Sequence, residues 1–456
     1  MQVMKNTILT GASIVALIAA APASAQQVQT SDIWQNGEDN SATVSQQGNE
    51  NLSDVDQDGD DNFVEVTQTE NPVGSTPFNT PSNESIIDQD GDNSRARVEQ
   101  NNDNPGGQSN IANITQVSSY DPADTDADST VPSGYANNAR VIQNGSDNQS
   151  TMVQDDSAGG ITGAAAYNSQ EGTGHRSTIN QDYTGVNGVE FDPASRVDVI
   201  QSGTNNISDV DQSRQANSLI VTQSASNNFS DVDQYRQGNT GTVLQSGSDN
   251  DSNLFQDQFN DATVSQTGDG NDSNLIQDTS NFASITQSGN GNGSLVTQGE
   301  GLAPPSPTDV GRDNSATVIQ SGDGNTSAID QRRDSTALVT QSGGSNISDI
   351  QQIGGAGSDN SAIVEQLGSA DVSNILQDGA NQFANVLQNG SSEYSSIMQN
   401  GDGNSALVDQ SGSNNESYID QNGTGNAATV TQTGTSDYSS VAQNGTGNTA
   451  TVTQGN

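Results

Sequence analysis

Residues 421–432 read QNGTGNAATVTQ, and residues 443–454 read QNGTGNTATVTQ, nearly the same segment 22 positions further along the chain. Counting back from the last glutamine of each segment, valine, alanine and asparagine stand two, four and six positions earlier. Alternate residues of a β-strand point to the same side, so these four residues share one face. Threonine and valine favour strands, and the Gly-rich residues before each asparagine favour a tight turn. The segment therefore predicts a strand followed by a turn.

The same template, N-x-A/S-x-V/I/L-x-Q, recurs at roughly 33 places along the chain. Its glutamine returns every 11 residues in two long runs, from Gln201 to Gln256 and from Gln366 to Gln454. In the C-terminal half the residue four positions before the glutamine alternates between serine and alanine, as at Ser417, Ala428 and Ser439. The repeat is therefore about 22 residues long and has two non-identical halves, each a strand and a turn.

A unit with so little apolar surface can bury a face only by stacking on copies of itself. Each strand would pair with its equivalent in the next repeat, about 4.8 Å away. We expect an all-β fold, a two-sheet parallel β-solenoid of about 16 rungs. Its interior would hold small aliphatic side chains and stacked Asn and Gln amides, because buried amides are stable only when hydrogen-bonded. The expected stacking ladder includes Asn404, Gln410, Asn415, Gln421, Asn426, Gln432, Gln443, Asn448 and Gln454.

Proline marks the places where the repeat is interrupted. Proline cannot donate a hydrogen bond to a β-ladder, and every proline after Gln26 lies where the 11-residue spacing breaks. These breaks are rich in Gly, Pro and Asp, so we expect loops that bulge from the turns near residues 69–82, 101–109, 117–136, 155–174, 182–194 and 299–312. The template resumes in phase after most of them, which predicts a single repeat region over residues 26–456.

The composition alone would indicate disorder. Only 29% of residues are hydrophobic and 4% aromatic, and the formal net charge is −46. The average composition contains no information on periodicity, however, and we give the regular repeat more weight than the composition. An exported disordered chain is the alternative. A chain this acidic is not expected to bind nucleic acid. It has no cysteine, so repetitive backbone hydrogen bonding must take the place of disulfides.

The first 25 residues predict a secretory signal peptide. Lys5 precedes an apolar run over residues 8–21, and Ala23-Ser24-Ala25 forms an A-x-A cleavage site before Gln26. The apolar run is too short to span a bilayer. We therefore expect a secreted, extracellular protein.

Acidic residues repeat on one outer face. The sequence SDVDQ occurs at residues 53–57, 208–212 and 230–234, and its aspartates flank an inward valine. Like charges on adjacent strands oppose association, so we expect these aspartates to act as gatekeepers. The alternative is calcium bound between rungs. The expected gatekeepers are Asp209, Asp211, Asp231 and Asp233, and no metal site or cofactor is assigned.

Nothing in the sequence predicts an enzyme. His175 is the only histidine and is expected in or beside a loop, with neither a second histidine nor a cysteine to form a triad or a zinc site. The carboxylates have no apolar pocket that could tune them for acid–base catalysis. Trp34 is expected to be an outward aromatic or an end-cap residue.

The repeat units resemble a known family. GDGNTSAIDQ (322–331), GDGNSALVDQ (401–410) and GTGNAATVTQ (423–432) are similar to the curlin repeat of bacterial curli fibres. The resemblance is greatest to the minor, nucleator-type curlin and covers nearly all of residues 31–456. Its asparagine and glutamine positions correspond to the stacking residues of the ladder described above.

The resemblance implies an extracellular functional amyloid. Subunits of this family are exported unfolded through an outer-membrane pore and polymerise into surface fibres for adhesion and biofilm matrix. The implied partners are further copies of the chain, other curlin-like subunits and the pore, with no small-molecule substrate. Whether this chain would be a main subunit or a nucleator stays open. A monomeric acidic β-solenoid that binds calcium or a surface partner is the alternative function.

Overall fold

The computed structural model describes residues 29–48, 50–70, 83–102, 109–118, 137–156, 164–182, 195–214, 216–299, 313–354 and 359–455. These residues form strands and turns and no helix. The chain divides into two compact units, Met1–Gly238 and Asn239–Asn456. In each unit the odd-numbered strands build one sheet and the even-numbered strands another, and neighbouring strands are parallel. The predicted fold class, an all-β two-sheet parallel solenoid, is confirmed.

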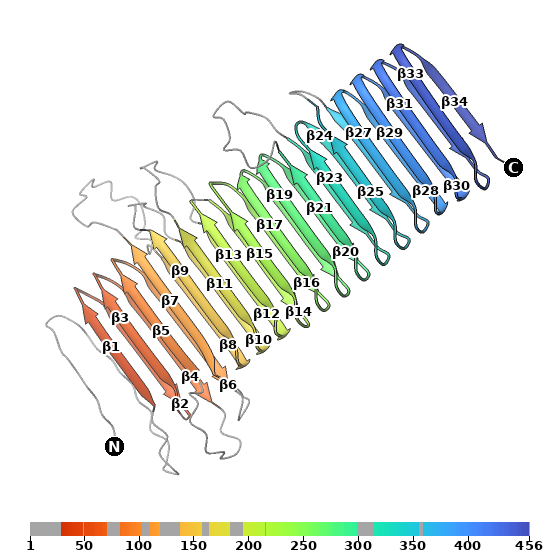
Figure 1. The fold of residues 1–456 in the computed structure, drawn as a ribbon. Coiled ribbons are helices and arrows are strands. Elements are labelled where there is room, and N and C mark those ends of the chain that lie inside the picture. Colours follow the sequence, from red (N-terminus) through yellow and green to blue (C-terminus); the bar gives the residue numbers. More distant parts are fainter. Residues whose placement is uncertain are drawn as a thin grey trace, which may run out of the picture. The chain divides into compact units, whose positions relative to one another are not determined.

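In the first unit, strands with equivalent sequences lie side by side (Figure 1). Its odd-numbered sheet contains β1 (Thr30–Asn36), β3 (Leu52–Asp58), β5 (Asn83–Asp90), β7 (Asn110–Ser118), β9 (Gln149–Asp156), β11 (Arg176–Asp182), β13 (Ile207–Ser213) and β15 (Phe229–Gln234). Its even-numbered sheet contains β2 (Ser41–Gln47), β4 (Phe63–Glu70), β6 (Arg95–Asn102), β8 (Asn138–Ser146), β10 (Ala165–Thr173), β12 (Arg196–Thr204) and β14 (Ser218–Ser224).

The second unit repeats this arrangement. Its even-numbered sheet contains β16 (Thr240–Ser246), β18 (Asp261–Thr267), β20 (Phe282–Ser288), β22 (Ser315–Gln320), β24 (Ser335–Gln341), β26 (Asn360–Gln366), β28 (Phe383–Ser391), β30 (Ser405–Ser413), β32 (Ala427–Gln432) and β34 (Thr449–Gln454). Its odd-numbered sheet contains β17 (Asp251–Gln258), β19 (Asp272–Thr279), β21 (Gly293–Gln298), β23 (Thr326–Gln331), β25 (Ile347–Gln352), β27 (Val372–Ala380), β29 (Tyr394–Asp402), β31 (Glu416–Thr424) and β33 (Tyr438–Thr446). The described residues thus hold 17 odd-numbered and 17 even-numbered strands, against about 16 expected rungs.

The template sets the register of every pair. Gln421 on β31 lies opposite Gln443 on β33, and Gln410 on β30 lies opposite Gln432 on β32. In the strands between β1 and β34, the residues two and four positions before the glutamine are buried, as Val408 and Ala406 are before Gln410. A slip of one residue would turn every inward side chain to the outside, so this inward set fixes the register.

One expected loop is wrong. Residues 155–174 were expected to bulge out, but Ala165–Thr173 form β10, which pairs with β8 and β12 in register. The template hides this strand because Asn168 stands where valine is usual and Ala164 where asparagine is usual. Asn168 is tolerated inside because its Nδ2 donates to Ser150 Oγ at 2.7 Å.

The other expected insertions and the expected signal peptide fall mainly on residues outside the described ranges. Strands or turns reach the edges of those insertions, for example at Glu70, Asn102, Ser118, Asp182 and Gly299. The described residues do not include the expected signal peptide, residues 1–25. They also do not include most of each of the other expected insertions, namely segments 71–82, 103–108, 119–136, 183–194 and 300–312.

Glycine at the strand ends lets successive turns stack. Gly401 has φ of 117°, and a Cβ added to it would lie 2.1 Å from the carbonyl oxygen of Gly423 in the next rung. Gly425 also has positive φ, 65°, but a Cβ there would meet no atom within 4 Å. The first glycine is required by both backbone and space, and the second by the backbone alone.

We therefore expect Gly401→Ala to lower the unfolding free energy by about 3 kcal/mol and Gly425→Ala by about 1 kcal/mol. The first substitution adds a clash with a neighbouring backbone to an unfavourable φ, whereas the second adds only the φ cost. Urea unfolding followed by far-ultraviolet circular dichroism measures both. Equal losses for the two variants would contradict the stacked-turn explanation.

Candidate functional site: the amide ladder and the outer faces

A ladder of glutamine amides runs along the interior of each sheet. We call the inward glutamine that ends each template, together with its equivalents on neighbouring strands, the glutamine ladder. Gln399 Nε2 donates to Gln421 Oε1 at 2.9 Å, and Gln421 Nε2 donates to Gln443 Oε1 at 2.9 Å. These side chains are buried, so each amide replaces its lost water contacts with the amide of the next rung.

The second amide hydrogen of each glutamine joins the two sheets. Gln421 Nε2 also donates to the carbonyl oxygen of Ser405 at 3.0 Å, and Gln410 Nε2 donates to that of Tyr394 at 2.9 Å. In both cases the acceptor lies 16 residues earlier, at the start of the preceding strand. Each glutamine therefore holds neighbouring rungs together and also ties one sheet to the other.

The residues six positions before the ladder glutamines form a second stack, here called the asparagine column. Asn404 Oδ1 accepts a hydrogen bond from the backbone N–H of Asn426 at 3.0 Å. Asn404 Nδ2 donates to the carbonyl oxygens of Asn400, at 3.2 Å, and Gly423, at 3.1 Å. One asparagine thus closes its own turn and binds the next turn, which explains why the template pairs asparagine with glycine.

The structure places the nine expected ladder residues as follows. Gln410, Gln421, Gln432, Asn404, Asn415 and Asn426 are buried, Gln443 is 7% exposed, Gln454 is half-buried and Asn448 is exposed. All nine take part in hydrogen bonds between rungs. The residues with greatest exposure lie in or next to β34.

Four ionisable residues, His175, Asp371, Glu393 and the half-buried Asp437, replace asparagine in the column, and the sequence analysis missed their role. His175, expected in or beside a loop, is fully buried in the turn before β11. Its Nδ1 accepts the backbone N–H of Asn206 at 3.3 Å, and its Nε2 lies 3.1 Å from the carbonyl oxygen of Glu171. A neutral ring protonated on Nε2 reproduces the acceptor and donor of asparagine. Burial lowers the pKa of His175, which favours this neutral form.

Asp371 and Glu393 occupy consecutive positions in the asparagine column of the second unit. Asp371 Oδ1 accepts the backbone N–H of Glu393 at 2.9 Å, as an asparagine would. Asp371 Oδ2 and Glu393 Oε2 are buried and have no hydrogen-bond partner among the described residues. Burial, and then the nearby Asp371 carboxyl, raise the pKa of Glu393 to about 7; burial also raises the pKa of Asp371. Counting six residues back from Gln377 and Gln399 would have found both.

The expected gatekeepers lie on the outer face of the odd-numbered sheet. Asp209 is the register partner of Asp231, and Asp211 is that of Asp233. Burial, followed by Asp231, Asp211 and Asp209, raises the pKa of Asp233 to about 6. Folded-state carboxyls with raised pKa values contribute stability below their unfolded pKa and lose it as the pH rises. The contribution of Asp233 is therefore fully present below pH 3.8 and is lost as the pH rises through about 6.

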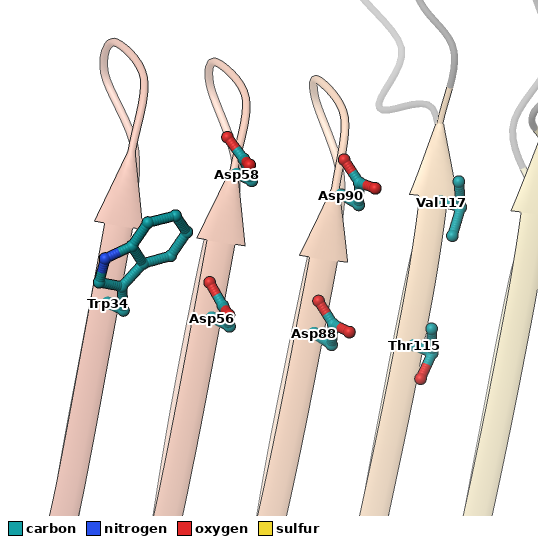
Figure 2. A pocket seen from close by; sticks show the side chains of 7 residues that line it. All are labelled: Trp34, Asp56, Asp58, Asp88, Asp90, Thr115 and Val117. Carbon is teal, nitrogen blue, oxygen red and sulfur yellow. The ribbon is translucent and has the colours of Figure 1, made fainter.

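Trp34 lines a hollow on the same outer face, over β1, β3, β5 and β7 (Figure 2). The other lining residues, Asp56, Asp58, Asp88, Asp90, Thr115 and Val117, come from the three strands that follow β1 in the sheet. We call this hollow the acidic hollow. Of the two expectations for Trp34, an outward aromatic agrees with its 44% exposure on β1.

The described part of the chain contains neither a cluster of metal-binding side chains nor a membrane-spanning helix. No group of three or more His, Cys, Asp or Glu side chains there is arranged to hold a metal ion. No helix there is long and apolar enough to cross a membrane.

Stacked strands, a continuous amide ladder and glycine turns define the chain as a structural β-solenoid of short repeats. The family model described as the curlin associated repeat matches five regions, residues 37–69, 311–332, 333–368, 394–423 and 423–455. These five regions are therefore curlin-associated repeats, and such repeats are typical of a structural family of extracellular curli fibres. A search of curated proteins finds no match.

Proposed function

We propose that the chain is a secreted, non-enzymatic subunit of curli-type fibres that self-assembles at the cell surface for adhesion and biofilm matrix. The proposal includes export through an outer-membrane pore and co-assembly with other curlin-like subunits. The curlin repeats support a fibre subunit. Its physical basis is the way in which the ladder joins one rung to the next.

The observation that carries the proposal is that the ladder does not depend on how the chain connects its rungs. Gln256 and Gln277 are linked at 3.0 Å across 21 residues, and Gln100 and Gln143 at 2.8 Å across 43 residues. The hydrogen bond between the two glutamine side chains is the same in both cases, although the stretch of chain that links the two strands is twice as long in the second. A rung needs only a partner strand with the same inward pattern, and a second copy of the chain carries that pattern many times.

Strand β34 lies at the edge of the even-numbered sheet of the second unit, next to β32. Its inward side chains follow the template, so an equivalent strand of a second copy could pair with it. Ala450, Val452 and Gln454 are only half-buried, whereas their partners Ala428, Val430 and Gln432 on β32 are buried. Covering this inward set with an equivalent strand would bury it and extend the ladder in register.

The purified chain should form fibres with meridional diffraction at about 4.7–4.8 Å, the spacing of stacked strands. Electron microscopy and sedimentation before and after incubation test the growth of fibres, and thioflavin fluorescence gives the rate. Assembly should be faster at pH 4.5 than at pH 8, because protonation neutralises outward carboxyls such as Asp209 and Asp233. A soluble species that keeps the strand spacing but does not grow, with or without a calcium chelator, would contradict the proposal and favour the monomeric solenoid.

A further inference from the structure

The two outer faces of the first unit differ in charge: acidic residues dominate the odd-numbered sheet, whereas arginines gather on the even-numbered sheet among fewer acidic residues. At outward positions before the ladder glutamines, the odd-numbered sheet carries Asp32, Asp54, Asp56, Glu84, Asp88, Asp209, Asp211, Asp231 and Asp233, with Arg176 as its basic residue. The even-numbered sheet carries Arg95, Arg97, Arg140 and Arg196, together with Glu65, Glu99 and Asp198. The chain has only ten arginines, so four on neighbouring strands of one face is a marked concentration. We call the outward side of β6, β8, β10 and β12 the arginine face.

Two arginines of this face lie directly beside each other. Arg97 on β6 is the register partner of Arg140 on β8. Arg97 Nε forms an ion pair with Glu65 at 3.3 Å, and its side chain remains 42% exposed. The Arg140 guanidinium lies 5.6 Å from the ring centre of Tyr167, and its Nε is buried without a hydrogen-bond partner among the described residues. Like charges on adjacent strands are unfavourable, so this pair would gain from an external acidic partner.

The acidic hollow has the complementary arrangement. Asp56 is the register partner of Asp88, and Asp58 is that of Asp90, so carboxylates stand in pairs one rung apart (Figure 2). Trp34 stands at one end of the hollow, and no basic side chain is among its lining residues. Burial, followed by Asp88, Asp54, Asp58 and Asp90, raises the pKa of Asp56, which reflects carboxylates that no cation compensates.

We propose that the acidic hollow of one copy receives the arginine face of a second copy, with Arg97 and Arg140 opposite the Asp56 and Asp88 carboxylates. A guanidinium donates two parallel hydrogen bonds to a carboxylate and also stacks on an indole ring, and the hollow offers both partners. The rung spacing is the same on the two faces, so two arginines one rung apart match two aspartates one rung apart. The acidic faces repel each other, which leaves the arginine face as the compatible surface.

This contact joins copies side by side. It involves the outer faces and not the ends of the ladder, so it goes beyond the proposed function and does not depend on fibre growth. Four strands about 4.8 Å apart and about 20 Å long give each face on the order of 400 Å², about half of a standard interface. A single contact is therefore weak, and the experiment has to trap it covalently.

The chain has no cysteine, so introduced cysteines report specific contacts. Thr115 lines the hollow, and Ile142 lies two residues from Arg140 on the arginine face. Full-length Thr115→Cys and Ile142→Cys chains, mixed under mild oxidation at neutral pH, should form a mixed disulfide dimer. Pairing Thr115→Cys with Thr178→Cys, on the same acidic face, should give about tenfold less dimer. Dimer yields that are equal for the two mixtures would overturn the proposal.

Charge variants identify the residues responsible. Arg97→Gln/Arg140→Gln in the Ile142→Cys chain, or Asp56→Asn/Asp88→Asn in the Thr115→Cys chain, should each lower the dimer yield about tenfold. The matched controls change the same charge elsewhere: Arg332→Gln/Arg333→Gln, and Asp209→Asn/Asp231→Asn on the same sheet. Controls that reduce the yield as much as the test variants would mean that only net charge matters, and the proposal would fail.

A charge exchange completes the test. Arg97→Asp/Arg140→Asp in the Ile142→Cys chain, and Asp56→Arg/Asp88→Arg in the Thr115→Cys chain, should each abolish the mixed disulfide dimer with the unchanged partner chain. Mixing the two variants should restore it. Circular dichroism confirms that each variant keeps its strands. If mixing does not restore the dimer while all variants are folded, the assigned pairing is wrong. Fibre growth, measured by thioflavin in parallel, separates failure of this contact from failure of the fibre proposal.

Discussion

Gln399→Leu is expected to destabilise the second unit by about 5 kcal/mol, although it places a hydrophobic residue in a buried position. Gln399 is fully buried and forms three hydrogen bonds. Its Oε1 accepts from Gln377 Nε2 at 2.9 Å, and its Nε2 donates to Gln421 Oε1 and to the Phe383 carbonyl oxygen, both at 2.9 Å. Leucine removes all three bonds, at about 1–3 kcal/mol each: Gln421 Oε1 loses its partner, and Gln377 Nε2 keeps only its bond to the Ser361 carbonyl oxygen, at 3.1 Å. The burial of leucine itself offsets only part of this loss.

The neighbouring residue supplies a matched control. Met398 lies on the outer face and is 48% exposed, so Met398→Gln should change stability by less than about 0.5 kcal/mol. Urea unfolding measures both variants, and amide hydrogen exchange should place the loss in β27, β29 and β31, since repeats contact mainly their neighbours. The double variant Gln377→Leu/Gln399→Leu should cost less than the sum of the two single variants, because both groups of one bond are removed together. Equal stability for Gln399→Leu and Met398→Gln would refute a stabilising role for the ladder.

The repeat predicts the architecture because one inward pattern serves every rung. From Gln366 to Gln454 the 11-residue spacing assigns each strand, its face and its partner without reference to distant sequence. The interruptions defeat the same reasoning. Arg97 and Arg140 are 43 residues apart, with two insertions between them, so spacing alone does not show that they are register partners. The sequence analysis expected the acidic face, but the pairing of Arg97 with Arg140 becomes visible only in the structure.

The template also conceals the positions where the interior departs from it. Defining the column by asparagine leaves out His175, Asp371, Glu393 and Asp437, although each stands six residues before a ladder glutamine. The geometry requires only an acceptor for the next N–H and a donor for nearby carbonyl oxygens, which a neutral histidine or a protonated acid can supply. Residue type is therefore a poorer guide to this column than position. Because the histidine and the acids can ionise, each of these replacements makes the stability of its rung depend on pH.

That dependence leads to the second large effect, in which Glu393→Gln is expected to stabilise the second unit in alkali. The folded-state pKa of Glu393 is about 7, above the ordinary value of 4.5, so the folded chain holds this proton more tightly than the unfolded chain. The stability linked to this proton is fully present below pH 4.5 and is lost as the pH rises through 7. At pH 8.5 the loss is on the order of 3 kcal/mol, and glutamine, which never ionises, avoids it.

Glutamine is compatible with this column. Gln382 occupies an equivalent position in the other sheet, where its Nε2 donates to the carbonyl oxygens of Asp378 and Gly401, both at 2.9 Å. Glu393 Oε2 has no partner, so the variant also supplies the donor that the carboxylate lacks. We expect Glu393→Gln and wild type to unfold at similar urea concentrations at pH 4, and the variant to be more stable at pH 8.5.

The same substitution at an exposed site separates this effect from net charge. Glu416→Gln, on the outer face of β31, removes an equal charge and should keep the pH dependence of the wild type. Hydrogen exchange at pH 8.5 should show faster opening around β27 and β29 in the wild type than in Glu393→Gln. The His175 rung of the first unit should behave oppositely, because its lowered pKa makes stability present above the ordinary value of 6.5 and lost as the pH falls. If Glu393→Gln left the alkaline stability unchanged, Glu393 would be ionised in the folded chain without penalty, and a neutral acid in the asparagine column would be ruled out.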